Sequence, residues 1–278
     1  IETPCIGTHT VTDQYIDSIE VNYNNETRYL QTSPEYFMKR LLANGSGPIF
    51  QICKCFRYEE NGKYHNPEFT MIEWYKPKFT HVELMKEVSD LISHCLSLPA
   101  AKYNTYAEVF LQYLDFCPHT ISANELHEKL KEHLTLNDPE QYNKDECLQL
   151  LMSHSIEPQL GFTQPIIIYH YPASQAALAK INTQQQPHVA ERFELYIEGQ
   201  EIANGFHELT DKEEQEKRFT NDINSRIKNK KTVTDIDQKF LSCLPYMPEC
   251  SGVALGFDRL MMIKEGLDNI QQVISFSW

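Results

Sequence analysis

The chain has 278 residues, of which 41% are hydrophobic, and this fits one large domain with a sizeable core. Its formal net charge of −14 would repel a nucleic acid at long range, although a local basic patch could still bind one. No apolar run approaches the roughly 18 residues of a membrane span, and no signal peptide opens the chain, so we expect a cytoplasmic protein. The 8 cysteines lack zinc or C-x-x-C spacing, which predicts free thiols.

Strand-like and helix-like segments alternate through the first hundred residues. Residues 35–44 have apolar positions at helical spacing, and Gly45 follows where a helix commonly ends. Residues 48–57 and 68–77 resemble two buried strands joined by a polar loop. Residues 80–96 then have the pattern of an amphipathic helix.

The rest of the chain is less uniform. Residues from about 100 to 160 are polar and helix-rich, so we expect an insertion within a single domain that spans residues 1–278. The elements expected after it are a buried strand at 165–172, a hairpin at 191–209, a charged helix at 213–231, and small residues followed by an amphipathic helix at 250–266. The basic end of the charged helix, Arg226 to Lys231, is expected to be solvent surface, with a docking patch as the alternative.

The strand at 68–77 has a face of unusual composition. Period two places Phe69, Met71, Glu73 and Tyr75 on one side. These acidic and phenolic groups could face water on the open side of a sheet. A floor that binds a ligand with an apolar stem and charged ends explains the neighbouring Phe69 and Met71 better.

The predicted hairpin brings two acids together. A two-residue turn would pair Tyr196 with Glu201 and Glu194 with Ala203, so Glu194 and Glu201 would lie diagonally on one face. Like charges at that separation repel unless a cation lies between them, and Mg²⁺ with a nucleotide phosphate is one candidate. A solvated sheet face is the alternative.

Glu208 falls on the opposite parity of the same hairpin. A break in the strand near Asn204–Gly205 would be needed to bring this carboxylate into the same site. The sequence alone does not reveal such a break.

Three segments together resemble a known family. They are "FRYEE" with "YHNPEFTMIEWY" (56–75), "ERFELYIEGQEIANGFHEL" (191–209) and "GVALGFDRL" (252–260). They resemble motif 2, the magnesium hairpin and motif 3 of class II aminoacyl-tRNA synthetases of the lysyl type. The resemblance implies an α+β class II catalytic fold, an antiparallel sheet flanked by helices with a helical insertion.

The chain is more similar still to the elongation factor P lysine ligases, a family that consists of the synthetase catalytic domain. The segments "TSPEYFMKRLL" and "HYPASQAALAKI" favour it. So does Ala254, where lysyl synthetases usually carry glycine. The opening "IETP" resembles the tail of motif 1, whose helix would precede residue 1, and that motif implies a homodimer.

The resemblance implies roles for individual residues toward ATP and Mg²⁺. Arg57 would meet the α-phosphate and the substrate carboxylate, and Arg259 would meet the γ-phosphate, so both would be catalytic. Glu194 and Glu201 would carry Mg²⁺. The other residues implied at the nucleotide are Glu59, His65, Asn66, Phe69, Ile202 and Gly256. Tyr58 departs from the asparagine that related chains often carry.

The resemblance also implies a site for a lysine-like substrate. Glu35 would bind the amino group near the carboxylate, whereas Glu208 and Tyr75 would bind the terminal ammonium. The remaining positions implied here are Ser33, Asn204 and Ala254. Carboxylates at both ends with apolar walls between them suit a lysine-like ligand.

The sequence therefore predicts an ATP-dependent ligase. It would activate (R)-β-lysine, or lysine less well, as an adenylate and transfer it to a lysine side chain of elongation factor P. Charging of tRNA and contact with a membrane are not expected. Two alternatives stay open: a catalytic fragment of a lysyl-tRNA synthetase, and a non-catalytic synthetase-like regulatory subunit.

Overall fold

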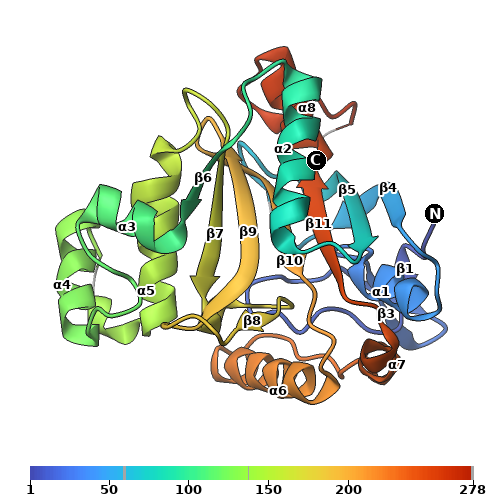
Figure 1. The fold of residues 1–278 in the computed structure, drawn as a ribbon. Coiled ribbons are helices and arrows are strands. Elements are labelled where there is room, and N and C mark those ends of the chain that lie inside the picture. Colours follow the sequence, from blue (N-terminus) through green and yellow to red (C-terminus); the bar gives the residue numbers. More distant parts are fainter. Residues whose placement is uncertain (59–60, 137, 277–278) are drawn as a thin grey trace. The chain divides into compact units, whose positions relative to one another are not determined.

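The computed structural model describes residues 1–58, 61–136 and 138–276 (Figure 1). The chain forms two compact units. The first unit comprises Ile1–Thr80 and Glu208–Trp278, and the second comprises His81–His207. Each unit is considered by itself below.

The strands of the first unit form two groups. A small antiparallel sheet has the order β1-β3-β2 and consists of β1 (Ile6–Gly7), β2 (Glu20–Tyr23) and β3 (Glu26–Leu30). The second group has the order β4-β5-β11 and consists of β4 (Ile49–Phe56), β5 (Glu68–Pro77) and β11 (Cys250–Gly256). These neighbours are antiparallel, with Ile52 opposite Ile72 and Glu73 opposite Ala254. The two strands predicted around the polar loop are confirmed.

The helices of the first unit are α1 (Glu35–Ala43), α6 (Lys212–Lys228), α7 (Gln238–Cys243) and α8 (Phe257–Glu265). Short 3-10 turns lie at Leu244–Tyr246 and Ile270–Gln272. Aromatic stacking joins α1 to α7, because the rings of Tyr36 and Phe240 lie 4.1 Å apart at 13°. The predicted small-residue segment before α8 is itself the strand β11.

The second unit contains a four-strand arrangement with the order β10-β9-β7-β6. Its strands are β6 (Lys102–Thr105), β7 (Ile166–Pro172), β9 (Val189–Ile197) and β10 (Gln200–His207), and β8 (Ile181–Asn182) pairs with β9. The pair β6–β7 is parallel and the others are antiparallel. The α+β class is as expected, with one parallel pair that the sequence did not predict.

The helices of the second unit are α2 (His81–Leu96), α3 (Tyr106–Leu114), α4 (Ala123–His133) and α5 (Lys144–Leu151). A π-helical turn (Met152–Ile156) and 3-10 turns at Pro139–Gln141, Glu157–Gln159 and Ala173–Gln175 complete the unit. Capping boxes at Thr105, Ser122 and Asn143 start α3, α4 and α5 by satisfying the free amide groups there. Among these helices, α3 lies beside β6 and β7, and α4 packs against α5 (Figure 1). Phe110 and Leu148 are fully buried in their shared core. Region 100–160 is thus helix-rich as expected, and its status as an insertion stays a prediction.

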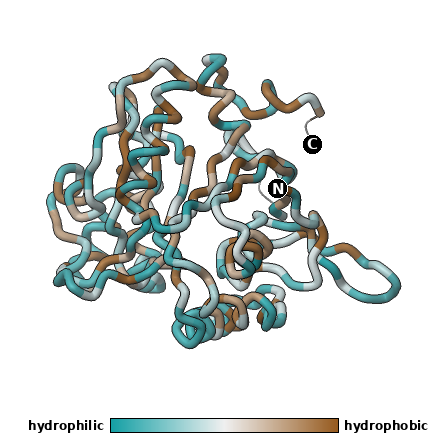
Figure 2. Tube along the Cα trace, turned by 45° about the vertical axis from the view of Figure 1, so that its right-hand side comes forward, coloured by the Kyte–Doolittle hydropathy of each residue, from teal (hydrophilic) through white to brown (hydrophobic). Residues whose placement is uncertain are grey.

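The hydropathy of the residues varies with the turns of the helices. Hydrophilic and hydrophobic residues alternate along the helices (Figure 2), as the apolar face of α2 illustrates: Met85, Val88 and Ile92 are buried. Leu91 of the same helix is half-buried. Among the described residues, no helix combines the length and apolarity needed to cross a membrane.

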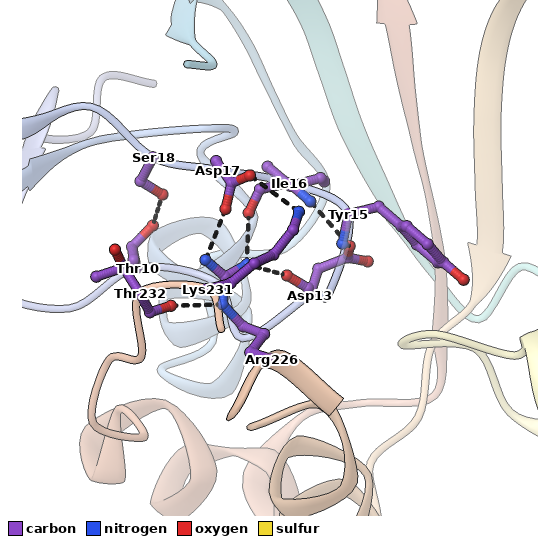
Figure 3. Close-up of polar contacts among 9 residues, drawn as sticks. All are labelled: Thr10, Asp13, Tyr15, Ile16, Asp17, Ser18, Arg226, Lys231 and Thr232. Atoms are coloured by element: carbon purple, nitrogen blue, oxygen red, sulfur yellow. Dashed lines mark hydrogen bonds and ion pairs between the residues drawn. The ribbon is translucent and has the colours of Figure 1, made fainter. Parts of the chain in front are cut away.

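The basic end of α6 corrects one prediction. Arg226 is buried, with 5% of its surface exposed, whereas we expected solvent surface from Arg226 to Lys231. Its guanidinium donates to Asp17 Oδ1 at 2.6 Å and to backbone oxygens of Asp13, Ile16 and Thr232 (Figure 3). Lys231 Nζ lies 3.0 Å from Asp17 Oδ2. Arg226 therefore links α6 to residues 13–17, whereas residues 227–230 are exposed, as predicted.

All eight cysteines are free thiols, as predicted. Cys53 and Cys55 come closest to a pair, with their sulfur atoms 4.0 Å apart on β4. That distance is about twice the length of a disulfide bond.

Candidate functional site

A carboxylate cluster in the first unit surrounds a buried lysine. We use this name for Glu35, Lys39, Glu73, Tyr75 and Glu208. Lys39 Nζ lies 2.6 Å from Glu35 Oε1 and 2.5 Å from Glu208 Oε2. The Lys39 side chain is 1% exposed. Burial alone would lower the pKa of Lys39, but the attraction of Glu208 and Glu35 outweighs it and raises the pKa.

Glu73 and Tyr75 form the other side of this cluster. The Tyr75 hydroxyl donates to Glu73 Oε1 at 2.7 Å, and the two residues are 3% and 2% exposed, respectively. Such burial excludes the alternative of a solvated sheet face. Glu73 Oε2 has no hydrogen-bond partner among the described residues. Burial, with Glu35 next in importance, raises the pKa of Glu73 well above its usual range.

Gly252 on β11 allows Tyr75 and Glu208 to approach each other. A Cβ atom at this position would lie 2.3 Å from Tyr75 Cε1 and 2.5 Å from Glu208 Oε1. Contacts that short are impossible, so the packing here requires glycine. The sequence singled out Gly256 instead, where an added Cβ would meet only carbon atoms of Arg259, the nearest at 3.7 Å. Within the protein alone, Gly256 is not required for packing.

Replacing Glu73 with glutamine should change the pH dependence of stability. Because the pKa of Glu73 is raised in the folded chain, the folded state retains a proton that the unfolded state releases above about pH 4.3. Wild-type stability should therefore fall as the pH rises from about 4.3 toward the raised pKa of Glu73 in the folded chain. The fall should be up to about 1.4 kcal/mol per pH unit. Glu73→Gln should remove that fall, so it should gain stability over wild type toward neutral pH.

Urea unfolding of both proteins between about pH 4 and 8 measures the difference. Asp222, whose pKa is raised to about 7, affects both proteins alike and cancels. Glu128→Gln, on the exposed surface of α4, is the matched control and should show no pH-dependent difference. A difference between Glu73→Gln and wild type that does not change with pH would contradict the raised pKa.

The arginines predicted to be catalytic lie in the first unit, each beside a predicted nucleotide residue. The Arg57 guanidinium lies 5.2 Å from the centre of the Phe69 ring, as in a cation–π pair. Arg259 Nη2 lies 2.7 Å from His65 Nε2, and Arg259 Nε donates to the backbone oxygen of Tyr64. The structure therefore brings Arg57 to Phe69 and Arg259 to His65.

The other predicted nucleotide residues of the first unit have varied surroundings. Asn66 is buried and donates to the Glu68 backbone oxygen at 2.6 Å. Glu59 lies outside the described residues. Tyr58, the departure from the family pattern, is 57% exposed. Ser33 Oγ accepts a hydrogen bond from the Glu35 amide at 3.2 Å, just before α1 begins.

The hairpin of the second unit has the predicted turn but a different register. Tyr196 pairs with Glu201 as expected, whereas Glu194 pairs with Asn204 rather than with Ala203. The register shifts between Glu201 and Ala203, because a β-bulge there adds one residue to β10. The irregularity of this strand therefore lies before Asn204–Gly205, at the predicted nucleotide residue Ile202, which is buried.

Glu194 accepts hydrogen bonds from four side chains of its own unit. Arg192 and Asn204 donate to Oε1, and Tyr171 and Tyr196 donate to Oε2. Burial and the negative charge of Glu194 raise the pKa of both tyrosines, which keeps them protonated as donors. Glu194 is thus held in one orientation.

Arg192 supplies the cation that the sequence argument required between the two acids. It pairs with Glu194, and the charge of Glu201 also acts on it. Glu194 and Glu201 nevertheless offer oxygen ligands of the kind that Mg²⁺ prefers. Glu201 is half-exposed, and the donors around Glu194 resemble those that orient metal-bound carboxylates. The donor set fits Mg²⁺, although the repulsion argument no longer requires the ion.

Sequence reasoning missed three participants: Lys39, Arg192 and the carboxyl group of Glu73 as an acid with a raised pKa. One signal was present, since Glu35 and Lys39 are spaced i, i+4 on the predicted helix. Nothing in the local pattern indicated that Lys39 would be buried or that Glu208 would reach it.

Comparison with known families fits these observations. The whole chain, residues 1–278, matches the model of the family described as "tRNA synthetases class II (D, K and N)". The chain therefore belongs to this family. Its fold is the class II catalytic fold, and enzymes of this class activate amino acids with ATP and Mg²⁺.

Proposed function

We propose that this chain activates a lysine-like amino acid, (R)-β-lysine in preference to lysine, as an adenylate and transfers it to a lysine side chain of elongation factor P. The family description covers aspartate, lysine and asparagine. The choice among these amino acids depends on the charge of the site that receives the side chain.

The carboxylate cluster favours a substrate whose side chain is cationic. Glu35 and Glu208 both pair with the ammonium of Lys39. Glu73 adds a third carboxyl group, which is buried and whose Oε2 lacks a partner among the described residues. A substrate ammonium would hydrogen-bond with these acids. The carboxylate of aspartate would instead be repelled.

The family resemblance supports the remaining roles. Arg57 and Arg259 would stabilise the charge of the phosphates as the substrate carboxylate attacks and pyrophosphate leaves. Glu194 and Glu201 would hold Mg²⁺, which supplies charge neutralisation at the phosphates. Homodimer formation remains part of the proposal because the resemblance to motif 1 implies it.

Amino-acid-dependent exchange of pyrophosphate into ATP tests the activation step. We expect exchange with (R)-β-lysine, weaker exchange with lysine, and none above background with aspartate or asparagine. Omission of Mg²⁺ should abolish it. Exchange that requires aspartate or asparagine would overturn the assignment, and the absence of exchange with all four amino acids would favour a non-catalytic regulatory subunit.

Ala254 provides a test of the preferred isomer. It lies opposite Glu73 on β11 and is half-buried. A methyl group there would crowd the α-amino group of lysine and fill the space left when the amino group sits on the β-carbon. Ala254→Gly should therefore raise kcat/KM for lysine and lower it for (R)-β-lysine. The ratio should change by about 1–3 kcal/mol, roughly 10- to 200-fold.

The two substrates serve as controls for each other in this experiment. A general loss of folding or ATP binding would lower both kcat/KM values together. If both values change by the same factor, the Ala254 methyl group has a packing role and the isomer preference has another origin, with Ser33 and Glu35 the next positions to test.

A further inference from the structure

A group of side chains of the kinds that can bind a metal ion lies in the second unit, and its residues are distinct from Glu194 and Glu201. It consists of His81 at the start of α2, Glu191 on β9 and His207 at the end of β10. One ligand atom from each residue can be chosen so that all three lie within 4.8 Å of one another. We call these residues the histidine cluster.

The distances within the histidine cluster are compatible with a shared ion. His207 Nδ1 lies 2.5 Å from Glu191 Oε2, and His81 Nδ1 lies 4.0 Å from the same oxygen. Ligand atoms about 2.0–2.1 Å from a tetrahedral Zn²⁺ are roughly 3.3 Å apart. The two observed distances lie on either side of this value, so small side-chain rotations would bring the three atoms around one ion.

His81 is the member whose surroundings call for a ligand. It is 5% exposed, and neither ring nitrogen has a hydrogen-bond partner among the described residues. A buried polar group without a partner is costly, and coordination by a metal would satisfy one nitrogen.

The neighbouring groups complete the environment of the histidine cluster. The His170 ring lies 5.5 Å from the His81 ring, at a register shift of β7. The positive charge of Lys180 also acts on Glu191 and would oppose a bound cation.

From this geometry we propose that His81, Glu191 and His207 form a binding site for Zn²⁺ or a similar borderline divalent transition metal. Two imidazoles and one carboxylate favour such an ion over Mg²⁺, which prefers oxygen ligands alone. The ion would join α2 to the β9–β10 hairpin and stabilise the second unit. The inference does not depend on the proposed ligase activity.

Zinc titration of the whole chain tests this site. Chelator-treated protein is titrated with Zn²⁺ against a competing indicator in the presence of excess Mg²⁺. We expect one Zn²⁺ per chain. Loss of a partner beyond the ligands themselves typically weakens metal affinity about 10- to 100-fold, so His81→Ala, His207→Ala and Glu191→Gln should each weaken it at least that much.

Two variants serve as matched controls. His188→Ala removes an exposed histidine, and Cys53→Ser removes a half-buried thiol from the closest cysteine pair. Both should bind Zn²⁺ as wild type does. Loss of binding in Cys53→Ser with retention in His81→Ala, or no Zn²⁺ binding by wild type, would overturn the proposal.

Two further measurements can be made on the wild-type protein, so they do not depend on whether a variant folds. Zn²⁺ should raise the Tm of wild type, because a ligand that binds the folded state stabilises it, and should leave the Tm of His81→Ala unchanged. Co²⁺ bound to wild type should give the visible absorption of a four-coordinate site with nitrogen and oxygen ligands. Thiolate-to-cobalt charge-transfer bands would instead assign the metal to cysteines and overturn the proposal.

Discussion

Arg57→Ala and Arg259→Ala should each lower the rate of (R)-β-lysine-dependent pyrophosphate exchange by at least about 10²-fold. Loss of a group that stabilises transition-state charge typically costs this much or more, equivalent to about 2.7 kcal/mol. Arg57 lies against Phe69, and Arg259 lies beside His65. Each arginine is therefore positioned by a neighbour that the family resemblance also assigns to the nucleotide.

A matched arginine variant separates the loss of catalysis from a general effect of charge removal. Arg28 on β3 pairs with Glu26 and has no role in the proposed site, so Arg28→Ala should keep near-wild-type exchange. Circular dichroism and the Tm of the Arg57 and Arg259 variants should show that they fold. Exchange by a folded Arg57→Ala enzyme within a few-fold of wild type would refute its catalytic role.

Lys39→Met should produce the largest loss of stability, about 3–5 kcal/mol, the range observed when one partner of a buried ion pair is removed. The Lys39 ammonium pairs with both Glu35 and Glu208. Methionine has a similar volume, so packing changes little, but it removes this cation from the buried Glu208 and the partly buried Glu35. The free energy of unfolding in urea measures the effect.

Lys86 provides a close control for this substitution. Lys86 and Asp90 form an i, i+4 ion pair on α2, as Glu35 and Lys39 do on α1, but both of their side chains are highly exposed. Exposed pairs of this kind contribute little to stability because solvent screens them, so Lys86→Met should remain close to wild type. Equal losses from the two variants would show that Lys39 is not an essential counterion of the cluster.

The periodic elements of the fold could be predicted from the sequence because their apolar spacing is strong. The strands at 49–56 and 68–77 and the helix at 81–96 lie within a residue or two of their predicted limits. The register of the hairpin could not be predicted beyond Glu201. A β-bulge adds one residue to β10, and nothing in the composition of that strand specifies where this residue falls.

The ion-pair partners in the site could not be predicted from the sequence either. Local spacing places Glu35 and Lys39 on one side of α1, but the pairing of Lys39 with Glu208 joins residues 169 positions apart. Arg226 illustrates the same limit, because basic residues at a helix end usually face solvent. In the structure, Asp17 and backbone oxygens from distant residues surround it. Such burial depends on tertiary contacts rather than on local pattern.

The identity of the acceptor tests the proposed function most directly. The chain is incubated with ATP, Mg²⁺ and radiolabelled (R)-β-lysine or lysine, together with either elongation factor P or tRNA, and the Arg259→Ala variant serves as the inactive control. We predict ATP-dependent label on elongation factor P, stronger with (R)-β-lysine, and none above background on tRNA. Label on acid-precipitable tRNA with none on elongation factor P would contradict the proposal and identify the chain as the catalytic part of a lysyl-tRNA synthetase.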